Sequence, residues 1–191
     1  GDDGTVSYPA SSPYVVSVGG TRLSIIGGKV TETAWNRSGG GPSAYENRPD
    51  YQTDYGIASL KRVTPDVSYN GDPATGVSIY SNGLWYTVGG TSAGAPQWAA
   101  IHALGVTADN ENLYQKAKSG YSYYFRDITL GSTEYYSAST GYDYVTGLGS
   151  PLTFKFGTAL EVTPTAGASG TPITLMGTGF TPGSSVNISY L

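Results

Sequence analysis

The residues with the clearest capacity for chemistry lie in one octapeptide, Gly89-Gly90-Thr91-Ser92-Ala93-Gly94-Ala95-Pro96. An apolar run precedes it and helix-forming residues follow it, so it predicts a strand-to-helix turn with Ser92 at the start of the helix. Glycines permit the sharp turn, and a helix N-terminus favours negative charge on an attacking serine or an oxyanion. The Ser92 N–H could donate to that oxyanion. Ser92 could equally be an N-cap, a common role of serine before a helix.

Short apolar runs separated by glycine pairs surround this turn and predict short strands. The predicted strands cover residues 14–18, 23–26, 77–80 and 84–88. A loop-rich region is expected from residue 38 to 55, and the helix that begins near Ser92 is expected to end at Gly105. A second short helix is predicted from Glu111 to Lys118. Residues 119–150, rich in Tyr, Ser, Thr and Gly, predict a long ordered loop or small hairpin, a length that favours a function or a bound ion.

The composition shifts after Leu160, where short apolar runs again predict strands. The runs cover residues 161–165, 173–180 and 186–190. They resemble the opening of an immunoglobulin-like domain with a Gly-Thr-Gly-Phe turn, and such a sandwich needs about seven strands. We therefore expect two domains: residues 1–158, and an incomplete β domain over residues 159–191.

Five further segments occur in the same order as in a known peptidase family. They are Gly1-Asp2-Asp3-Gly4, Tyr8-Pro9-Ala10-Ser11-Ser12-Pro13-Tyr14-Val15, Val18-Gly19-Gly20-Thr21, Ser38-Gly39-Gly40-Gly41 and Val63-Thr64-Pro65-Asp66-Val67-Ser68. With the octapeptide they resemble the sedolisins, the serine-carboxyl peptidases, over roughly residues 1–155. Subtilisins share the serine segment but have Asn where Asp2 stands. The resemblance implies an α/β fold with a largely parallel sheet flanked by helices, of which this chain holds the C-terminal part.

The resemblance implies peptide-bond hydrolysis through an acyl-enzyme on Ser92, with Asp2 and backbone amides holding the oxyanion. In the sedolisins a Glu takes the serine proton and a second Asp orients that Glu. Both lie on a helix before the oxyanion segment, so the general base is expected outside this chain. A carboxylate base works best in acid, and Asp2 must be protonated to donate to an oxyanion. An acidic pH optimum is therefore expected.

Two internal candidates for a base fit poorly. Glu46 and Asp50 have i, i+4 spacing, but Pro49 between them disfavours a helix interior. The only histidine, His102, follows Ser92 by ten residues on the same predicted helix, about 15 Å along its axis at ~1.5 Å per residue. We expect neither to activate the serine.

A second constellation pairs Asp127-Ile128 with Ser139-Thr140-Gly141-Tyr142-Asp143. Two carboxylates together with backbone carbonyls suit calcium, which takes six or more oxygen ligands. The segment resembles the sedolisin calcium site, which implies Asp127 and Asp143 as side-chain ligands and the carbonyls of Ile128, Ser139 and Gly141 as the others. Ser139 stands where glycine is common in the family. A tyrosine-rich loop with two unrelated carboxylates is the alternative.

Asp66 and the tryptophans receive structural assignments. Asp66, in Pro65-Asp66-Val67-Ser68, is expected to hydrogen-bond a turn, and a direct role in a site is the alternative. Trp35, Trp85 and Trp98 either fill the core or line a substrate groove.

Charge and composition exclude several partner classes. The net charge is −4 without a basic stripe, so nucleic acid and anionic membranes are not expected partners. No apolar run approaches the ~18 residues that cross a bilayer. Cysteine is absent, which excludes disulfides and thiolate chemistry. Charged residues make up only 13%, and Asn36-Arg37-Ser38 and Asn187-Ile188-Ser189 are glycosylation sequons, so an extracellular location is expected.

The sequence thus predicts a secreted, acid-acting serine endopeptidase with a polypeptide substrate and one structural Ca²⁺. The other expected partner is a preceding part of the same domain, which carries the base. A non-catalytic surface or structural protein that kept the fold is the main alternative, and a true subtilisin relative, with Asp and His upstream, is a third. An upstream helix with Glu-x-x-x-Asp would favour the first interpretation. The 191 residues alone are expected to be inactive.

Overall fold

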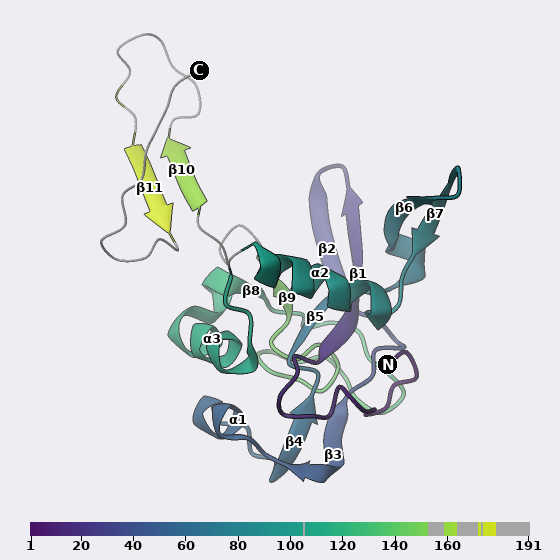
Figure 1. Ribbon diagram of the computed structural model, residues 1–191, viewed down its shortest axis with the longest axis vertical. Helices are drawn as coiled ribbons and strands as arrows, with labels where there is room; N and C mark the ends of the chain where they lie inside the picture. Colours follow the sequence, from purple (N-terminus) through teal and green to yellow (C-terminus); the bar gives the residue numbers. More distant parts are fainter. Residues whose placement is uncertain (105, 153–158, 164–171, 173, 179–191) are drawn as a thin grey trace.

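The computed structural model describes residues 1–104, 106–152, 159–163, 172 and 174–178. A three-stranded sheet, in the order β2-β1-β5, lies at its centre (Figure 1). The hairpin of β1 (Val18–Ile26) and β2 (Lys29–Ala34) is antiparallel, whereas β1 and β5 (Val67–Asn70) run parallel with Val18 opposite Val67. Parallel strands combined with helices confirm the predicted α/β class.

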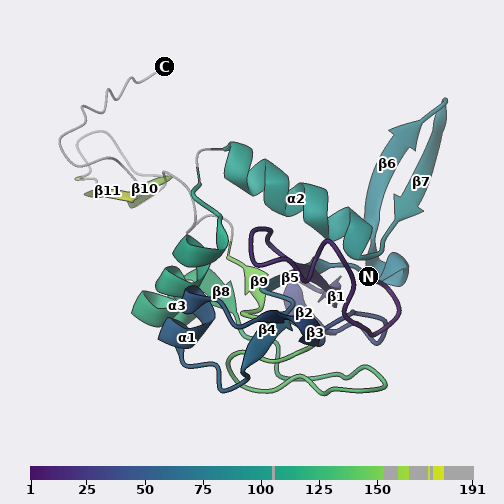
Figure 2. The same cartoon turned by 60° about the horizontal axis from the view of Figure 1, so that its bottom comes forward.

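The remaining described strands pair as separate antiparallel ladders. These are β3 (Gly41–Asn47) with β4 (Lys61–Thr64), β6 (Val77–Ser81) with β7 (Leu84–Val88), β8 (Phe125–Arg126) with β9 (Ser150–Pro151), and β10 (Ala159–Thr163) with β11 (Thr174–Thr178). The β6–β7 hairpin extends beyond the body of the molecule in both views (Figures 1 and 2).

Three α-helices and one short 3₁₀ helix complete the described elements. They are α1 (Asp50–Tyr55), η1 (Pro73–Thr75), α2 (Thr91–Ala103) and α3 (Asn110–Tyr124). Asp109 caps α3 by accepting from Asn112 N–H, and Gly120 interrupts its helical geometry with φ −173° and ψ 64°. Among these helices, none combines the length and apolar character required to cross a bilayer.

The main core lies between the sheet and the helices α2 and α3. Its most deeply buried side chains include Val63, Val67, Leu113, Tyr114, Phe125 and Leu148. Trp98 joins α2 to the sheet because its indole N–H donates to Ser68 O at 3.1 Å. Trp35 is also buried, whereas Trp85 on β7 is 72% exposed. Two of the three tryptophans therefore fill the core, and the third does not.

A buried ion pair holds the N-terminal segment against this core. Both terminal nitrogens of Arg62 donate to the Asp66 carboxylate at 2.6 Å, and neither side chain has exposed surface. Asp66 also accepts from Ser17 N–H at 2.8 Å and from the Tyr114 hydroxyl at 3.0 Å. Burial without these partners would be costly, so the four donors make Asp66 a structural centre rather than only a turn residue.

Several sequence-based boundaries were wrong. The region expected to be loop-rich, residues 38–55, contains β3 and α1. The strand expected at residues 14–18 begins only at Val18. The helix expected to end at Lys118 continues to Tyr124, so the first part of the predicted 119–150 loop is helical.

The expected β domain is described only in part. Strands β10 and β11 pair antiparallel, with Ala159 opposite Thr178, as strands of such a domain would. The strand predicted at residues 186–190 lies outside the described residues, so the immunoglobulin-like assignment stays a prediction.

Candidate active site

The turn before α2 exposes Ser92. Gly90 is the N-cap, with φ 87° and ψ 160°, a conformation that a residue with a Cβ rarely adopts. The helix begins at Thr91, which is buried, and Ser92 is exposed in its first turn. Ser92 is therefore not the N-cap, and the capping alternative for its side chain was wrong. The N–H groups of a first helical turn have no acceptor within the helix, which leaves the Ser92 N–H available to a ligand.

Asp2 lies at the N-terminus of the same helix. Its Oδ1 accepts hydrogen bonds from Thr91 N–H at 2.8 Å and from the Thr91 hydroxyl at 2.7 Å. Its Oδ2 would be 2.7 Å from a Cβ placed on Gly90, so a larger residue at position 90 would displace the Asp2 carboxyl group. Asp2 and Thr91, 89 positions apart in the sequence, are therefore in contact, and the Asp2 carboxyl group lies at the residue that precedes Ser92. Figures 1 and 2 both show the chain's N-terminus near the start of α2.

The turn role proposed as the alternative for Asp2 belongs instead to its neighbour. Asp3 Oδ1 accepts from the N–H and the hydroxyl of Thr5 at 3.1 and 3.0 Å, and these hydrogen bonds lower the pKa of Asp3. Gly4 follows with φ 77°. Because Asp3 closes the turn, Asp2 is free to point toward α2.

The segment Ser38-Gly39-Gly40-Gly41 holds the Asp2 backbone in place. Gly39 N–H donates to Gly1 O at 3.0 Å, and the Arg37 side chain donates to Asp2 O at 2.9 Å. A Cβ on Gly39 would lie 2.6 Å from Thr5 O, so only glycine lets the two backbones approach this closely. This glycine run, predicted only as a family motif, is what positions Asp2.

Ser38 fixes the glycine run to the rest of the core. Its buried hydroxyl donates to Val145 O at 2.7 Å and accepts from Gly20 N–H at 2.9 Å. A Cβ on Gly40 would lie 1.9 Å from Tyr144 O. Three segments, from β1, from the glycine run and from the loop before β9, therefore meet at one point.

These contacts determine what Asp2 can do. Its Oδ1 already accepts two hydrogen bonds, and a protonated carboxyl group carries its proton on one oxygen only. A proton on Asp2 therefore belongs on Oδ2, the oxygen on the Gly90 side. A carbonyl oxygen that develops negative charge needs hydrogen-bond donors, and this O–H and the Ser92 N–H would then supply them.

No described carboxylate is hydrogen-bonded to the Ser92 hydroxyl. Over residues 1–104 and 106–152, Glu46 lies in β3 and Asp50 opens α1 after Pro49, its N-cap, so these two carboxylates do not share a helix. His102 Nδ1 accepts from Ala108 N–H at 3.2 Å and so closes the end of α2. The structure therefore gives none of the three the geometry of a base for Ser92.

The predicted calcium residues do come together. Gly141 N–H donates to both oxygens of Asp127 at 3.1 Å, and Ser139 N–H donates to Asp143 Oδ2 at 3.2 Å. Residues 139 and 141 of this loop therefore each contact one of the two carboxylates, and Ile128, which follows Asp127, is buried. Within the described ranges no third Asp, Glu, His or Cys joins a possible metal cluster, so any further ligands would be backbone oxygens. That donor set suits calcium better than a transition metal.

The Asp143 environment is a test of this fit. Burial raises the pKa of Asp143 above its usual value, although hydrogen bonds from Thr146, Val145 and Ser139 partly offset it. No Lys or Arg forms an ion pair with Asp143 in the described part of the chain. A buried carboxylate without a cationic partner is costly, and a bound cation would remove that cost.

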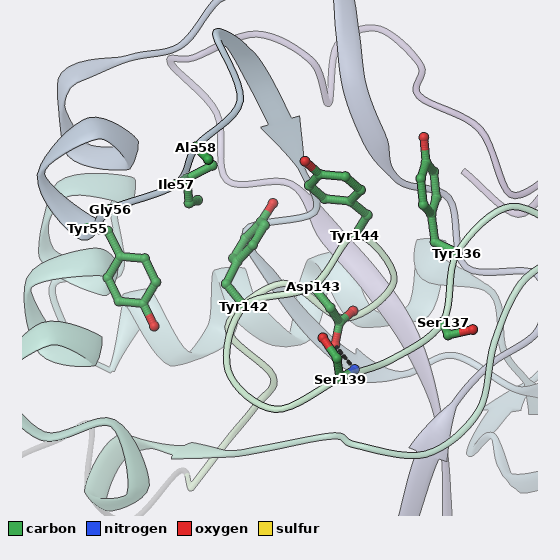
Figure 3. Close-up of a pocket in the computed structure, with 10 residues that line it drawn as sticks. All are labelled: Tyr55, Gly56, Ile57, Ala58, Tyr136, Ser137, Ser139, Tyr142, Asp143 and Tyr144. Carbon is green, nitrogen blue, oxygen red and sulfur yellow. Dashed lines mark hydrogen bonds between the residues drawn. The ribbon is translucent and has the colours of Figure 1, made fainter.

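Asp143 and Ser139 also border a pocket of about 400 Å³. Figure 3 shows their hydrogen bond, with Tyr142 and Tyr144 near it and Tyr55 farther to the left, all three of which line the pocket. The Tyr142 hydroxyl donates to Pro65 O at 2.9 Å, and the Tyr121 hydroxyl donates to Asp127 Oδ1 at 3.2 Å. Tyrosines thus anchor the predicted long loop from both ends.

Sequence reasoning missed the donor that orients Asp2 and the partners of Asp66. Thr91 was quoted only as part of the serine octapeptide, and no local pattern links it to a residue 89 positions away. Arg62 stands four residues before Asp66, a spacing that an ion pair can use, but these residues lie in and next to strand β4 rather than on a helix. Only the fold shows that both are fully buried.

Comparison with known proteins agrees with this geometry. The subtilase family matches residues 1–149. Sedolisin of Pseudomonas sp. (strain 101) is 36% identical over 168 residues, and kumamolisin of Bacillus sp. (strain MN-32) is 37% identical over 182 residues. These matches cover 76% and 81% of this chain but only 29% and 32% of those proteins. Tripeptidyl-peptidase sed1 of Aspergillus fumigatus is 33% identical, with 75% of this chain and 29% of that protein covered. The chain thus spans about a third of the length of these curated relatives.

A solved structure gives the same result at the level of the fold. Pseudomonas sedolisin (serine-carboxyl proteinase), complexed with two molecules of pseudo-iodotyrostatin, has a TM-score of 0.67 and 34% sequence identity. The match covers 78% of this chain and 47% of that chain, and it confirms the predicted subtilisin-like fold. The chain therefore belongs to the subtilase family, and within that family it is related to the sedolisins.

Proposed function

We propose that these residues are the nucleophile-bearing part of a secreted, acid-acting serine-carboxyl endopeptidase. The observation that carries the proposal is the position of Asp2, whose carboxyl group is hydrogen-bonded to the residue before Ser92. An exposed serine, a free helical N–H and a carboxyl group that can carry a proton are three of the parts that acyl transfer requires, and the general base is the fourth.

The proposed reaction begins with attack of Ser92 Oγ on the substrate's carbonyl carbon. The C=O electron pair moves to oxygen, where Asp2 and the Ser92 N–H donate to it. The serine proton goes to the general base, which then gives it to the leaving amine as the C–N bond breaks. Water hydrolyses the resulting ester by the same route in reverse order. Asp2 acts as a donor only when protonated, which supports action in acid.

We assign the general base to a segment outside these 191 residues. Helix α2 supports this assignment, since its exposed residues include Ala95, Pro96, Ala99 and Ala100. A helix with apolar residues on all sides is normally buried. Another part of the peptidase domain, covering the outer side of α2, would bury these residues and reach Ser92 from that side.

Calcium belongs to the same proposal as a structural ion. Asp127 and Asp143 would supply carboxylate oxygens, and the carbonyls of Ile128, Ser139 and Gly141 would complete the donor set. When bound, the ion would supply positive charge between two carboxylates and no chemistry at Ser92. Its role would be to fix the loop that ends at Val145, whose carbonyl accepts from Ser38.

Replacement of Ser92 in the intact protein tests the function. The intact protein should hydrolyse a denatured protein substrate in acid, and Ser92→Ala should reduce the rate to background, while Ser81→Ala on the β6–β7 hairpin should not. Equal activity of the parent and Ser92→Ala would overturn the proposal. Absence of activity in both, despite a stable fold, would favour the non-catalytic surface or structural protein.

A blocked substrate separates two modes of cleavage. Relatives named tripeptidyl-peptidases are among the matches, so the endopeptidase assignment needs its own experiment. An endopeptidase cleaves an N-terminally acetylated peptide at internal bonds, whereas an enzyme that releases tripeptides requires a free N-terminus. Mass spectrometry of the products decides between them.

A further inference from the structure

The β6–β7 hairpin carries exposed aromatic side chains on a strand that leads directly to the nucleophile. Tyr80 and Trp85 are directly opposite each other in the ladder, with ring centroids 5.2 Å apart and planes at 55°. They are 62% and 72% exposed. Strand β7 ends at Val88, two residues before the N-cap of the Ser92 helix.

The hairpin is well formed despite this exposure. Asn82 and Gly83 make its turn with φ 50° and 80°, the conformation that favours tight two-residue hairpins. Its base is fixed because Gly90 N–H donates to Gly71 O and because Gly76 lies against the Val88 carbonyl. An aromatic pair on a rigid arm is therefore held at a defined position relative to Ser92.

Two properties indicate what this arm can bind. First, β6 and β7 form a two-stranded sheet, so in the described part of the chain each strand has one edge without a strand partner. Such an edge offers unpaired N–H and C=O groups to an extended peptide, which can add as a further strand. Second, residues 76–90 include no charged side chain, and the exposed rings offer apolar area. The complementary ligand is an extended, uncharged polypeptide with an aromatic or apolar side chain.

We propose that the Tyr80–Trp85 pair is a distal subsite for the same polypeptide that is cleaved at Ser92, an inference that rests on the proposed function. The length of the strand fixes the distance. Trp85 and Gly89 are four residues apart, about 13 Å of strand at ~3.3 Å per residue. An extended substrate covers that distance in about four residues, so the pair contacts a side chain four or five residues from the scissile bond.

The specific prediction is a dependence on substrate length. A short peptide, about three residues on each side of the scissile bond, cannot reach the pair, whereas a long one of about eight on each side can. In the intact protein, Trp85→Ala and Tyr80→Ala should lower kcat/KM about tenfold for long peptides that carry phenylalanine at the distal position. For the short peptide, kcat/KM should not change.

Ile79→Ala is the matched control. Ile79 pairs with Tyr86, one position along the ladder, and its side chain therefore lies on the opposite face of the hairpin. The substitution removes exposed apolar area from the same hairpin without altering the aromatic pair. It should leave the ratio of long-peptide to short-peptide kcat/KM unchanged. A drop in that ratio equal to that of Trp85→Ala would overturn the subsite.

Thermal unfolding separates this proposal from coverage of the hairpin by protein. If another part of the protein or a second copy packs on the aromatic pair, Trp85→Ala should lower Tm and reduce kcat/KM equally for both peptides. That result overturns the proposal, as does an unchanged kcat/KM for both peptides.

A binding measurement makes the inference independent of catalysis. In a Ser92→Ala background, a long peptide should shift Trp emission to shorter wavelength with saturation, and Trp85→Phe should abolish the shift. Trp35 and Trp98 are only 7% and 4% exposed, so they contribute little to it. Saturable binding without cleavage by the parent enzyme would sustain the subsite and refute the proposed function. Absence of the shift while the parent cleaves the peptide would refute the subsite alone.

Discussion

Replacing Asp2 in two different ways distinguishes an oxyanion donor from a structural carboxylate. Asp2→Ala removes every polar contact of the side chain. Asp2→Asn keeps an oxygen that can accept from Thr91, and it places an NH₂ donor where the protonated carboxyl would carry its O–H. If Asp2 donates to the oxyanion, the amide should replace it and the methyl group should not.

The two substitutions should differ in the size of their effect on kcat. Loss of one oxyanion donor lowers kcat by about 10²–10³-fold, which we expect for Asp2→Ala. Asp2→Asn should stay within about tenfold of the parent enzyme. Asp2→Ala also loses two hydrogen bonds to Thr91, about 0.5–1.5 kcal/mol each, so the Tm should fall by about 2–12 °C. A modest loss of stability cannot produce the expected loss of kcat.

The assay is the pH profile of kcat and kcat/KM on one peptide, measured well below the Tm. At the pH where the parent enzyme is most active, the kcat of Asp2→Asn should lie close to the parental value and that of Asp2→Ala far below it. Asp54→Ala is the control, since Asp54 is an exposed carboxylate on α1 and takes no part in the turn that holds Asp2. The reasoning is refuted if Asp2→Ala retains a third or more of the parental kcat. It is also refuted if Asp2→Asn loses as much kcat as Asp2→Ala.

Three further predictions concern stability and metal binding. Asp66→Leu leaves Arg62 buried without its partner and should lower the free energy of unfolding by about 3–5 kcal/mol in urea titrations. The double variant that also carries Arg62→Met should recover much of that loss. Equal losses in the single and the double variant would contradict this prediction. Partial desolvation raises the pKa of Asp109, but hydrogen bonds from Asn112 outweigh this effect and hold the pKa below its usual value. The Asp109 cap therefore stabilises α3 at pH values above the unfolded-state pKa. This stabilisation is lost as the pH falls through the folded-state pKa. Asp109→Ala should therefore cost about 1 kcal/mol near neutral pH and less near pH 3 by thermal unfolding, and a cost that grows in acid would be inconsistent with this cap. A calcium chelator should lower the Tm of the parent protein and leave Asp127→Asn, already lower, nearly unchanged, whereas an unaffected parent Tm would exclude a structural calcium ion.

The sequence predicted the elements whose signals are local. The helix after Ser92 and the strands β6 and β7 were placed to within two residues, because short apolar runs and helix-forming alanines are signals that act over short distances. Strand β3 was missed because it follows a run of glycines and includes Pro42, a composition typical of loops. Its strand geometry comes from pairing with β4, which no window of adjacent residues contains.

The candidate site likewise combines features that local sequence predicts with features that depend on the fold. A serine at a helix start follows from local sequence, but its position beside Asp2 depends on Gly39 allowing two backbones to meet. Family resemblance suggested the pairing without giving its geometry. The structure adds that Thr91 occupies one oxygen of Asp2 and leaves the other toward Gly90.

Ser38 belongs both to the Asn36 sequon and to the buried junction that supports Asp2, which affects how glycosylation of this sequon should be tested. Asn36 is exposed, so the sequon is accessible to modification, yet its serine hydroxyl is buried between Gly20 and Val145. Ser38→Ala would abolish the acceptor motif and also break the junction that supports Asp2. A phenotype of that variant would therefore be misread as an effect of sugar, whereas Asn36→Gln removes the acceptor and leaves the junction intact.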